Sequence, residues 1–176
     1  MIAGIDPSLT GLAICISECV SDCDVHMRRF TSEASKDGMA GRFKRYRQLV
    51  RSTNNFLHQH DLELILLEGY SYASKGKAIL DIAEFGGLLR KSLLYDAVND
   101  GIRILEIPPS ALKKFITGKG NVSKMEMCVA IAKRYDVEYA TNDEYDAYAL
   151  AQMGAAILGK TRITKAQAAV VAPYLK

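Results

Sequence analysis

Short apolar runs separated by turn residues open the chain. Residues 1–5 are almost wholly apolar, and residues 11–16 form a second run after the turn-prone segment 7–10. Apolar runs of this length between turns are typical of β-strands. Residues 25–30 carry a weaker version of the pattern. We therefore predict three strands at the start of the chain, of which the first two form a hairpin.

Helical and strand-like patterns alternate over the rest of the chain. Residues 41–60 have apolar side chains at helical spacing, among them Phe43 and Tyr46, as expected of an amphipathic helix. Two later apolar runs are typical of strands that are covered on both faces. The remaining predicted elements are strand 62–67, helix 75–98, strand 102–107 and helices 110–116, 124–135 and 143–158.

This order of elements predicts an α/β fold with a mixed sheet, in which three antiparallel strands are followed by parallel strands and helices flank the sheet. A chain of 176 residues, 49% hydrophobic and 24% charged, fits one soluble domain. We place this domain at residues 1–159. Residues 160–176 hold four basic residues and no acidic one, and we treat them as a basic C-terminal tail.

Two aspartates stand at the start of the last predicted helix. Asp143 and Asp146 are three residues apart, so a helix would place them about one turn apart on one face. Like charges at that spacing repel each other unless a cation holds them, which favours metal binding. Acidic residues are also common in the first turn of any helix. Helix capping and metal binding therefore both remain open for this pair.

The predicted topology brings two more acids toward this pair. Asp6 follows the first strand and Glu68 follows the strand at 62–67, and parallel strands end at the same edge of a sheet. Ligands of open α/β sheets bind at that edge. Each acid alone is also explained as a turn or strand-end residue in water. Acids at three separate positions on one predicted edge are harder to assign to chance.

Four clustered carboxylates require compensation by metal, because they could not all stay ionised together at neutral pH. Oxygen ligands select Mg²⁺, for which Mn²⁺ can substitute. Two such ions about 4 Å apart would activate a water and stabilise the leaving oxygen of a phosphodiester. The pattern therefore indicates hydrolysis of nucleic acid.

At these residues the sequence resembles the RuvC-like Holliday junction resolvases of the RNase H-like superfamily. Four blocks carry the resemblance, in the family's order and with similar spacing. They are Gly4-Ile5-Asp6-Pro7-Ser8 with Thr10-Gly11, then Leu66-Leu67-Glu68, then Gly118-x-Gly120-x-x-x-Lys124, and lastly Asp143-x-x-Asp146-Ala147-x-Ala149-Leu150-Ala151. Together they span residues 1 to about 158.

The resemblance implies a fold, an activity and a set of residues. The fold is RNase H-like, and the activity is Mg²⁺-dependent cleavage of four-way DNA junctions by a homodimer. Asp6, Glu68, Asp143 and Asp146 are implied as catalytic metal ligands, and Lys124 as a contact to the DNA near the scissile phosphate.

Further DNA contacts are expected around these blocks. An aromatic residue commonly follows the catalytic glutamate in the family, where it stacks on bases, and here Tyr70 and Tyr72 stand on either side of Ser71. Packing under the next helix is an equal alternative for them. The other expected contacts are Lys75, Lys77 and Lys119.

Lys124 has support that does not depend on the family. Ser123 and Glu126 form a capping-box pattern, so Lys124 should open a helix whose N-terminus attracts phosphate. A capped surface helix with a solvated lysine is the alternative.

The sequence leaves the roles of three segments open. Residues 39–60 contain five basic residues and no acid, which fits a solvated helix face better than a phosphate-binding stripe; they are Arg42, Lys44, Arg45, Arg47 and Arg51. Helix 75–98 has apolar residues on more than one side, which indicates core packing or a dimer interface. The basic tail could be disordered, lie along DNA or reach across a dimer.

Cysteine content and hydropathy indicate a cytoplasmic protein, and the family resemblance implies a bacterial or virus-infected cell. The four cysteines show no disulfide framework, so we expect free thiols. Cys19, Cys23 and His26 lack the paired spacing and fourth ligand of a zinc site. No stretch approaches the roughly 18 apolar residues of a membrane span, and no export leader precedes the first strand.

Three other functions compete with junction resolution. An actin-like or sugar-kinase ATPase would share the Gly4–Gly11 pattern, but it needs two lobes and a second phosphate hairpin. A binder of branched DNA without catalysis would not need all four acids and Lys124. A general RNase H-like nuclease, acting on RNA/DNA hybrids or as an exonuclease, shares the metal chemistry and is harder to exclude.

Overall fold

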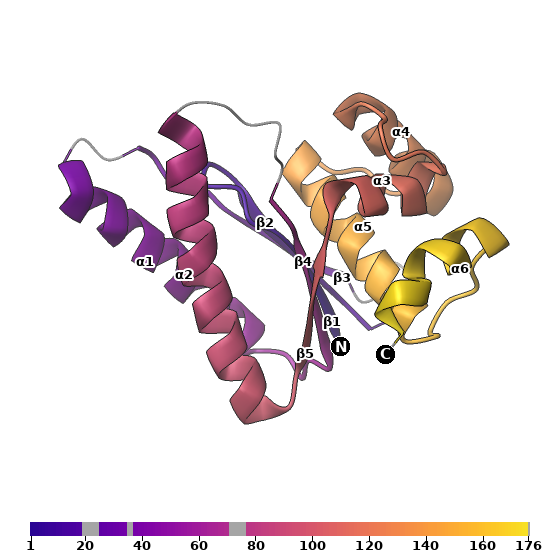
Figure 1. Ribbon diagram of the computed structural model, residues 1–176, viewed down its shortest axis with the longest axis horizontal. Helices are drawn as coiled ribbons and strands as arrows, with labels where there is room; N and C mark the ends of the chain where they lie inside the picture. Colours follow the sequence, from indigo (N-terminus) through magenta and orange to yellow (C-terminus); the bar gives the residue numbers. More distant parts are fainter. Residues whose placement is uncertain (19–24, 35–36, 71–76, 176) are drawn as a thin grey trace.

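A five-stranded mixed sheet forms the centre of the molecule (Figure 1). The computed structural model describes residues 1–18, 25–34, 37–70 and 77–175. The strands run in the order β3-β2-β1-β4-β5, with β1 antiparallel to β2, β2 antiparallel to β3, and both β4 and β5 parallel to their neighbours. Their bounds are Ile2–Asp6 (β1), Leu12–Ser17 (β2), Val25–Phe30 (β3), Leu64–Glu68 (β4) and Arg103–Ile107 (β5). The predicted fold class is confirmed.

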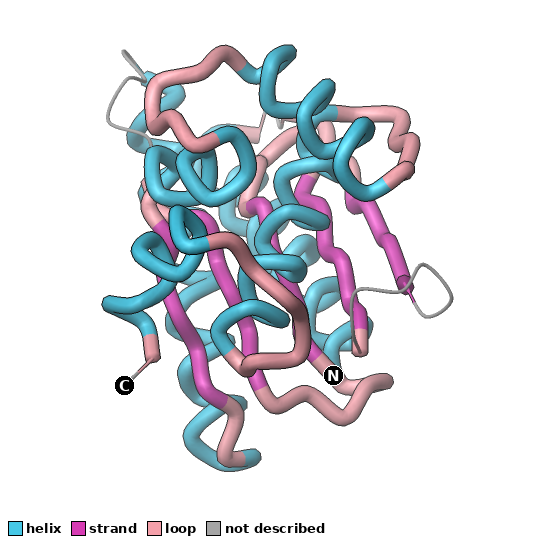
Figure 2. Tube along the Cα trace, turned by 90° about the vertical axis from the view of Figure 1, so that its right-hand side faces the viewer, coloured by secondary structure: helices cyan, strands magenta, loops and turns pink. Residues whose placement is uncertain are grey.

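Helices cover both faces of this sheet, as two views at right angles show (Figures 1 and 2). On one face α1 and α2 pack against the side chains of Ile5, Ile14 and Leu67. On the other face α3 to α6 enclose a second core around Ile2 and Leu66. The helices are α1 (Gly38–Leu57), α2 (Lys77–Asp100), α3 (Pro109–Thr117), α4 (Lys124–Tyr135), α5 (Asn142–Ile157) and α6 (Lys165–Val171), and a 3₁₀ turn, η2, spans Ala172–Tyr174.

Helix α5 lies directly against β1 and β2. Its residues from Asp146 to Ile157 are all buried, which explains why the sequence there is almost wholly apolar. Gly4 makes this close approach possible, because a Cβ at that position would lie 2.2 Å from the carbonyl oxygen of Ala147. The glycine in β1 and the small residues on α5 therefore set how near the helix comes to the strand.

The C-terminal segment is folded onto the domain. Val170 and Val171 of α6 are buried in the same core as α3, and the amide of Gln167 donates to the Phe115 carbonyl oxygen at 3.2 Å. Disorder, one of the three alternatives for the tail, does not fit the described residues 160–175. The division of the chain at residue 159 stays a prediction.

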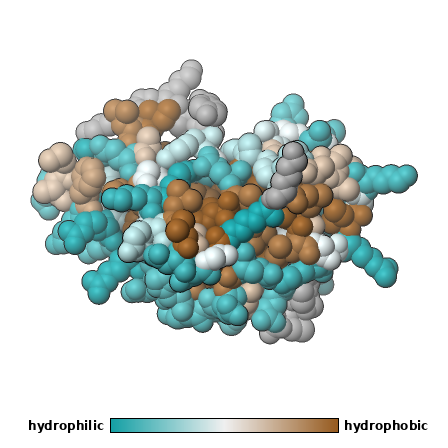
Figure 3. All heavy atoms as spheres, turned by 60° about the horizontal axis from the view of Figure 1, so that its bottom comes forward, coloured by the Kyte–Doolittle hydropathy of each residue, from teal (hydrophilic) through white to brown (hydrophobic). Residues whose placement is uncertain are grey.

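Helix α2 combines a buried side with an exposed apolar side. Leu89 and Leu93 are buried, whereas Leu94 is 54% exposed and Val98 is 81% exposed. The C-terminal turns of α2 lie at the bottom of Figure 1, and Figure 3 brings that side forward and shows apolar side chains gathered across its middle, bordered by hydrophilic ones. Core packing thus accounts for one face of α2 only.

Two further expectations concern thiols and membranes. Cys15 and Cys128 are buried free thiols, as predicted, whereas Cys19 and Cys23 lie outside the described residues. Within the described ranges, no helix combines the length and apolar character that crossing a bilayer requires.

Candidate metal centre

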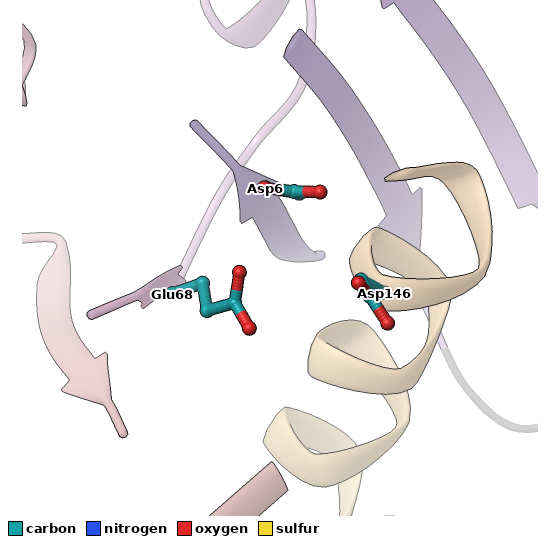
Figure 4. Close-up of side chains that lie close together, drawn as sticks. All are labelled: Asp6, Glu68 and Asp146. Carbon is teal, nitrogen blue, oxygen red and sulfur yellow. The ribbon is translucent and has the colours of Figure 1, made fainter. Parts of the chain in front are cut away.

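Three carboxylates meet where β1 and β4 end. Asp6 is the last residue of β1, Glu68 is the last residue of the parallel neighbour β4, and Asp146 lies near the start of α5. One oxygen from each lies within 4.8 Å of the others. Figure 4 shows the three carboxyl groups converging from these elements. Asp6 and Asp146 are each only 6% exposed, whereas Glu68 is partly buried.

Helix capping does not explain Asp143 and Asp146. The N-cap of α5 is Thr141, whose hydroxyl accepts from the Glu144 backbone N–H, while the Glu144 carboxylate accepts from the Thr141 backbone N–H at 2.8 Å. Thr141 and Glu144 therefore cap the helix, and the two aspartates do not. The Thr141-x-x-Glu144 pattern was readable in the sequence and was missed.

The cluster carries a strong electrostatic cost without a cation. Burial, together with Asp146, raises the pKa of Glu68 to about 7, and burial is also the main cause that raises the pKa of Asp146 to about 6. Burial and the charges of Glu68 and Asp146 raise the pKa of Asp6 well above its usual value. Buried oxygen ligands of this kind are the ones that hard divalent cations prefer. The residues present therefore fit a metal ion.

Among the ion pairs of the described residues, the one that involves this cluster is formed by Lys124. Its Nζ lies 3.8 Å from an oxygen of Asp146. Burial acts to lower the pKa of Lys124, but the acids, Asp146 first, raise it on balance. The predicted capping box is present, with the Ser123 backbone N–H donating to Glu126 at 2.8 Å and the Ser123 hydroxyl accepting from the Glu126 N–H. Lys124 is thus the first residue of α4 and points toward the acids.

Asp143, the fourth predicted ligand, is not part of the group of three. Its Oδ2 lies 3.7 Å from Nη2 of Arg29, although its charge still raises the pKa of Asp6. Arg29 stands on β3 opposite Ala13 of β2, which itself stands opposite Asp6. Cross-strand partners point to the same face of a sheet, so the arginine reaches toward α5 over the small Ala13. The Nε of Arg29 is buried without a hydrogen-bond partner among the described residues.

We expect Arg29 and Asp143 to stabilise the metal-free fold as a pair. Arg29→Gln should lower the free energy of unfolding by roughly 1 kcal/mol, because it leaves a partly buried carboxylate with less compensation. Asp143→Asn should cost much less in the Arg29→Gln background than in the wild type. A double-mutant cycle by urea denaturation measures this coupling, and strictly additive effects would contradict the pairing.

One further lysine near the acids was not anticipated. Lys113 of α3 donates to the Val122 carbonyl oxygen at 2.7 Å. Burial raises the pKa values of Glu68 and Asp146, and Lys113 acts with Lys124 against that rise. The spacing of charges along α3 gave no signal that this lysine would face the site, because its direction depends on how α3 packs against α4.

The other expected DNA contacts are placed only in part. Tyr70 packs against α2, with its ring 4.1 Å from the Arg90 guanidinium carbon and its hydroxyl 3.4 Å from the Ala83 carbonyl oxygen. The packing alternative therefore describes Tyr70 in this structure, and its stacking on bases stays a prediction. Lys119 is exposed in the turn between α3 and α4. Tyr72 and Lys75 lie outside the described residues, and Lys77 begins α2.

A chamber of about 660 Å³ opens beside the acids. Its wall includes Asp6, Glu68 and Lys124 on one side and the α2 residues Ile82 and Gly86 on another. Arg45 of α1 also reaches it. The acid cluster is therefore accessible from a cavity that is large enough for part of a polymeric substrate.

The acid cluster should make the stability of the metal-free protein fall with rising pH. A carboxyl whose folded pKa is raised favours folding while it is protonated, and that advantage is lost as pH rises from about 4 toward the folded values near 6 and 7. We expect the melting temperature to drop by about 5 to 10 °C between pH 5 and pH 8 in EDTA.

Divalent metal should reverse this loss at pH 8 and have little effect at pH 5, because protonated carboxyls bind it weakly. Differential scanning calorimetry in EDTA and in Mg²⁺ makes the comparison. Glu68→Gln is the matched variant, and it should flatten the pH dependence. A wild-type melting temperature that rises with pH in EDTA would contradict the proposed repulsion.

The strand order and the acids at the carboxyl edge of the sheet define an RNase H-like fold with an acidic site that could hold a metal ion. Solved structures share this fold. The Thermus thermophilus RuvC structure superposes with a TM-score of 0.63 at 19% identity, covering 90% of this chain and 96% of that one. A structure of T. thermophilus RuvC in complex with Holliday junction substrate gives a TM-score of 0.61 at 20% identity, covering 87% of this chain and 95% of that one.

The chain belongs to the family described as crossover junction endodeoxyribonuclease RuvC, whose model matches residues 2–154. The resemblance seen in the sequence is thereby confirmed. A RuvC from Chlamydia felis is 26% identical over 157 residues, covering 86% of this chain and 89% of the relative. A RuvC from Carboxydothermus hydrogenoformans is 29% identical over 113 residues, covering 63% of this chain and 69% of the relative.

Proposed function

We propose that this protein is a Mg²⁺-dependent endonuclease that resolves Holliday junctions and related branched DNA. The observation that carries the proposal is the meeting of Asp6, Glu68 and Asp146 within 4.8 Å at the carboxyl edge of the sheet. Family membership supports the activity, because the relatives are crossover junction endodeoxyribonucleases. A DNA substrate agrees with the expected cytoplasmic location, in a bacterium or a virus-infected cell.

The three carboxylates would hold two divalent cations, and Asp143 would join them or stay with Arg29. When bound, the cations supply a nucleophilic water and neutralise charge on the phosphate and the leaving oxygen. A carboxylate oxygen that is not used for a cation would accept a hydrogen bond from the water and orient it for in-line attack. Lys124 at the start of α4 contacts the scissile phosphate and balances the acids before DNA arrives.

A homodimer would place two such sites on the two opposed strands of a junction. Helix α2 supports this part of the proposal, because Leu80, Leu94 and Val98 on one side of it are 65%, 54% and 81% exposed. Exposed apolar area of this kind is typical of a protein interface. Sedimentation equilibrium of the wild type and of Leu94→Glu tests it, and a wild type that stays monomeric at micromolar concentration would contradict it.

The substrate is tested by comparing three labelled DNAs. Purified protein is incubated with a synthetic four-way junction, a Y-fork and a linear duplex, with and without Mg²⁺. We expect cleavage of the junction, weaker cleavage of the fork, an intact duplex, and no reaction without metal. Equal cleavage of all three would instead favour a general nuclease, and an intact junction that still binds tightly would favour a non-catalytic binder.

A further inference from the structure

The five basic residues of α1 divide into two groups with different surroundings. Arg42 is paired with Glu84 at 3.0 Å and Asp81 at 3.5 Å. Arg45 donates to the Ser32 hydroxyl and to the Leu9 carbonyl oxygen. Arg42 and Arg45 therefore bind other groups of the protein. Intramolecular contacts account for only these two of the five basic residues.

The other three basic residues face solvent. Lys44, Arg47 and Arg51 are exposed, and no ion pair within the described part of the chain engages them. They are three and four residues apart, so they follow one face of α1 at steps of about 4.5 and 6 Å along the helix axis. A row of unneutralised cations at this spacing is suited to a ligand with repeated negative charge.

These cations border a groove between α1 and α2, two helices that lie side by side (Figure 1). The groove has a volume of about 950 Å³, and Lys91 of α2 also lines it. We call it the α1–α2 groove. Its described lining contains no carboxylate, and amide side chains such as Gln48 and Asn55 supply further hydrogen-bonding groups. The groove is thus cationic from Lys44 to Arg51, and its far end is lined by neutral side chains such as Asn54 and Tyr95.

The α1–α2 groove and the chamber beside the metal centre are lined by neighbouring residues of α1. Arg45 lines the chamber that contains Asp6 and Glu68, and its neighbour in sequence, Lys44, lines the groove. From Lys44 to His58 the groove follows α1 for about 21 Å, the length of roughly six base steps of duplex DNA. Along the first part of this path a DNA strand would meet Lys44, Arg47 and Arg51, whereas Asp81, which lines the chamber, is paired with Arg42.

We infer that the α1–α2 groove is a second DNA contact, which binds the phosphate backbone of a substrate arm outside the crossover. This inference rests on the proposed function, which supplies the polyanion. The row of cations carries it, because phosphate contacts need no base recognition and act mainly through charge. An acidic protein segment or a second copy of this chain would be an alternative occupant, and the experiment separates them.

The groove variant is K44Q/R47Q/R51Q, and its matched control is K133Q/R162Q/K165Q on α4 and near α6, over the other face of the sheet. All six residues are exposed, and both variants remove three positive charges from the formal net charge of +3. Binding to the four-way junction is measured in EDTA, without cleavage, from 50 to 300 mM salt.

We expect the groove variant to bind about 10- to 100-fold more weakly at 100 mM salt, with a slope of log affinity against log salt that is smaller by about 2 to 3. The control should keep a slope within about half a unit of the wild type. Single-turnover cleavage in Mg²⁺ at saturating protein should stay within about two-fold of the wild type, because the acids are untouched.

Three outcomes would overturn the inference. One is a groove variant whose salt slope equals that of the wild type. Another is an equal loss in the control, which would show that net charge or the basic tail, rather than the groove, sets the affinity. The third is a groove variant that becomes monomeric in sedimentation while the wild type is dimeric, which would assign the groove to an interface between copies. A wild type that binds the junction without ever cutting it would count against the proposed function instead.

Discussion

Asp146→Asn is expected to reduce junction cleavage by about 10³-fold or more while leaving junction binding nearly intact. The carboxylate is buried beside Asp6 and Glu68, and its loss removes a charged ligand that an amide replaces poorly. A factor of 10³ corresponds to about 4 kcal/mol of transition-state stabilisation. Single-turnover kinetics with a labelled junction in Mg²⁺ provides the measurement.

Two companion variants make the Asp146 result specific. Glu138→Gln removes an exposed acid between α4 and α5 and should cleave at the wild-type rate. Calorimetry in EDTA at pH 8 should show that Asp146→Asn is more stable than the wild type, because one of three mutually repelling carboxylates is gone. Cleavage by Asp146→Asn at the wild-type rate would remove this residue from the catalytic site.

Gly4→Ala is expected to destabilise the protein by about 3 kcal/mol or more and to impair cleavage in whatever fraction folds. The new Cβ would lie 2.2 Å from the Ala147 carbonyl oxygen and 2.5 Å from the Ala151 nitrogen. Both are backbone atoms, so α5 must move away from β1, and overpacking of this kind is costly. Because Asp6 lies on β1 and Asp146 on α5, the same movement separates two of the acids.

Gly87→Ala is the matched control for Gly4→Ala. Gly87 lies within α2, where an added Cβ meets nothing within 4 Å, so alanine should stabilise the helix by about 0.5 to 1 kcal/mol. Urea denaturation of both variants gives the free energies. A Gly4→Ala protein as stable as the wild type would show that α5 does not approach β1 as closely as the structure has it.

The sheet and the acid cluster were largely accessible from the sequence. Apolar runs of five or six residues predicted four of the strands, and a weaker pattern at 25–30 predicted β3. The parallel direction of β1 and β4 follows from the helix between them. Asp6 and Glu68 were expected at one edge for that reason. Asp6 and Glu68 each end a strand, and Asp146 lies near the start of a helix. Local sequence patterns specify these boundaries, which is why the cluster could be expected.

Features that depend on three-dimensional packing could not be predicted. Arg29 reaches Asp143 only because of the β2–β3 register and because Ala13 and Gly11 are small, and no local pattern contains that information. Helix α6 is different, because its capping pattern Thr164-x-x-Gln167 before Val170 is a local signal for a helix within a segment of basic composition. Its packing on α3 is what the sequence did not reveal.

Anomalous diffraction from crystals soaked in Mn²⁺ tests the central claim most directly. We expect an anomalous peak among Asp6, Glu68 and Asp146, with ligand oxygens at about 2.1 Å, and no such peak in Glu68→Gln. A peak at Asp143 as well would show that the metal draws it from Arg29. Crystals that bind Mn²⁺ elsewhere and leave the three carboxylates without metal would contradict a metal-dependent nuclease site at this edge of the sheet.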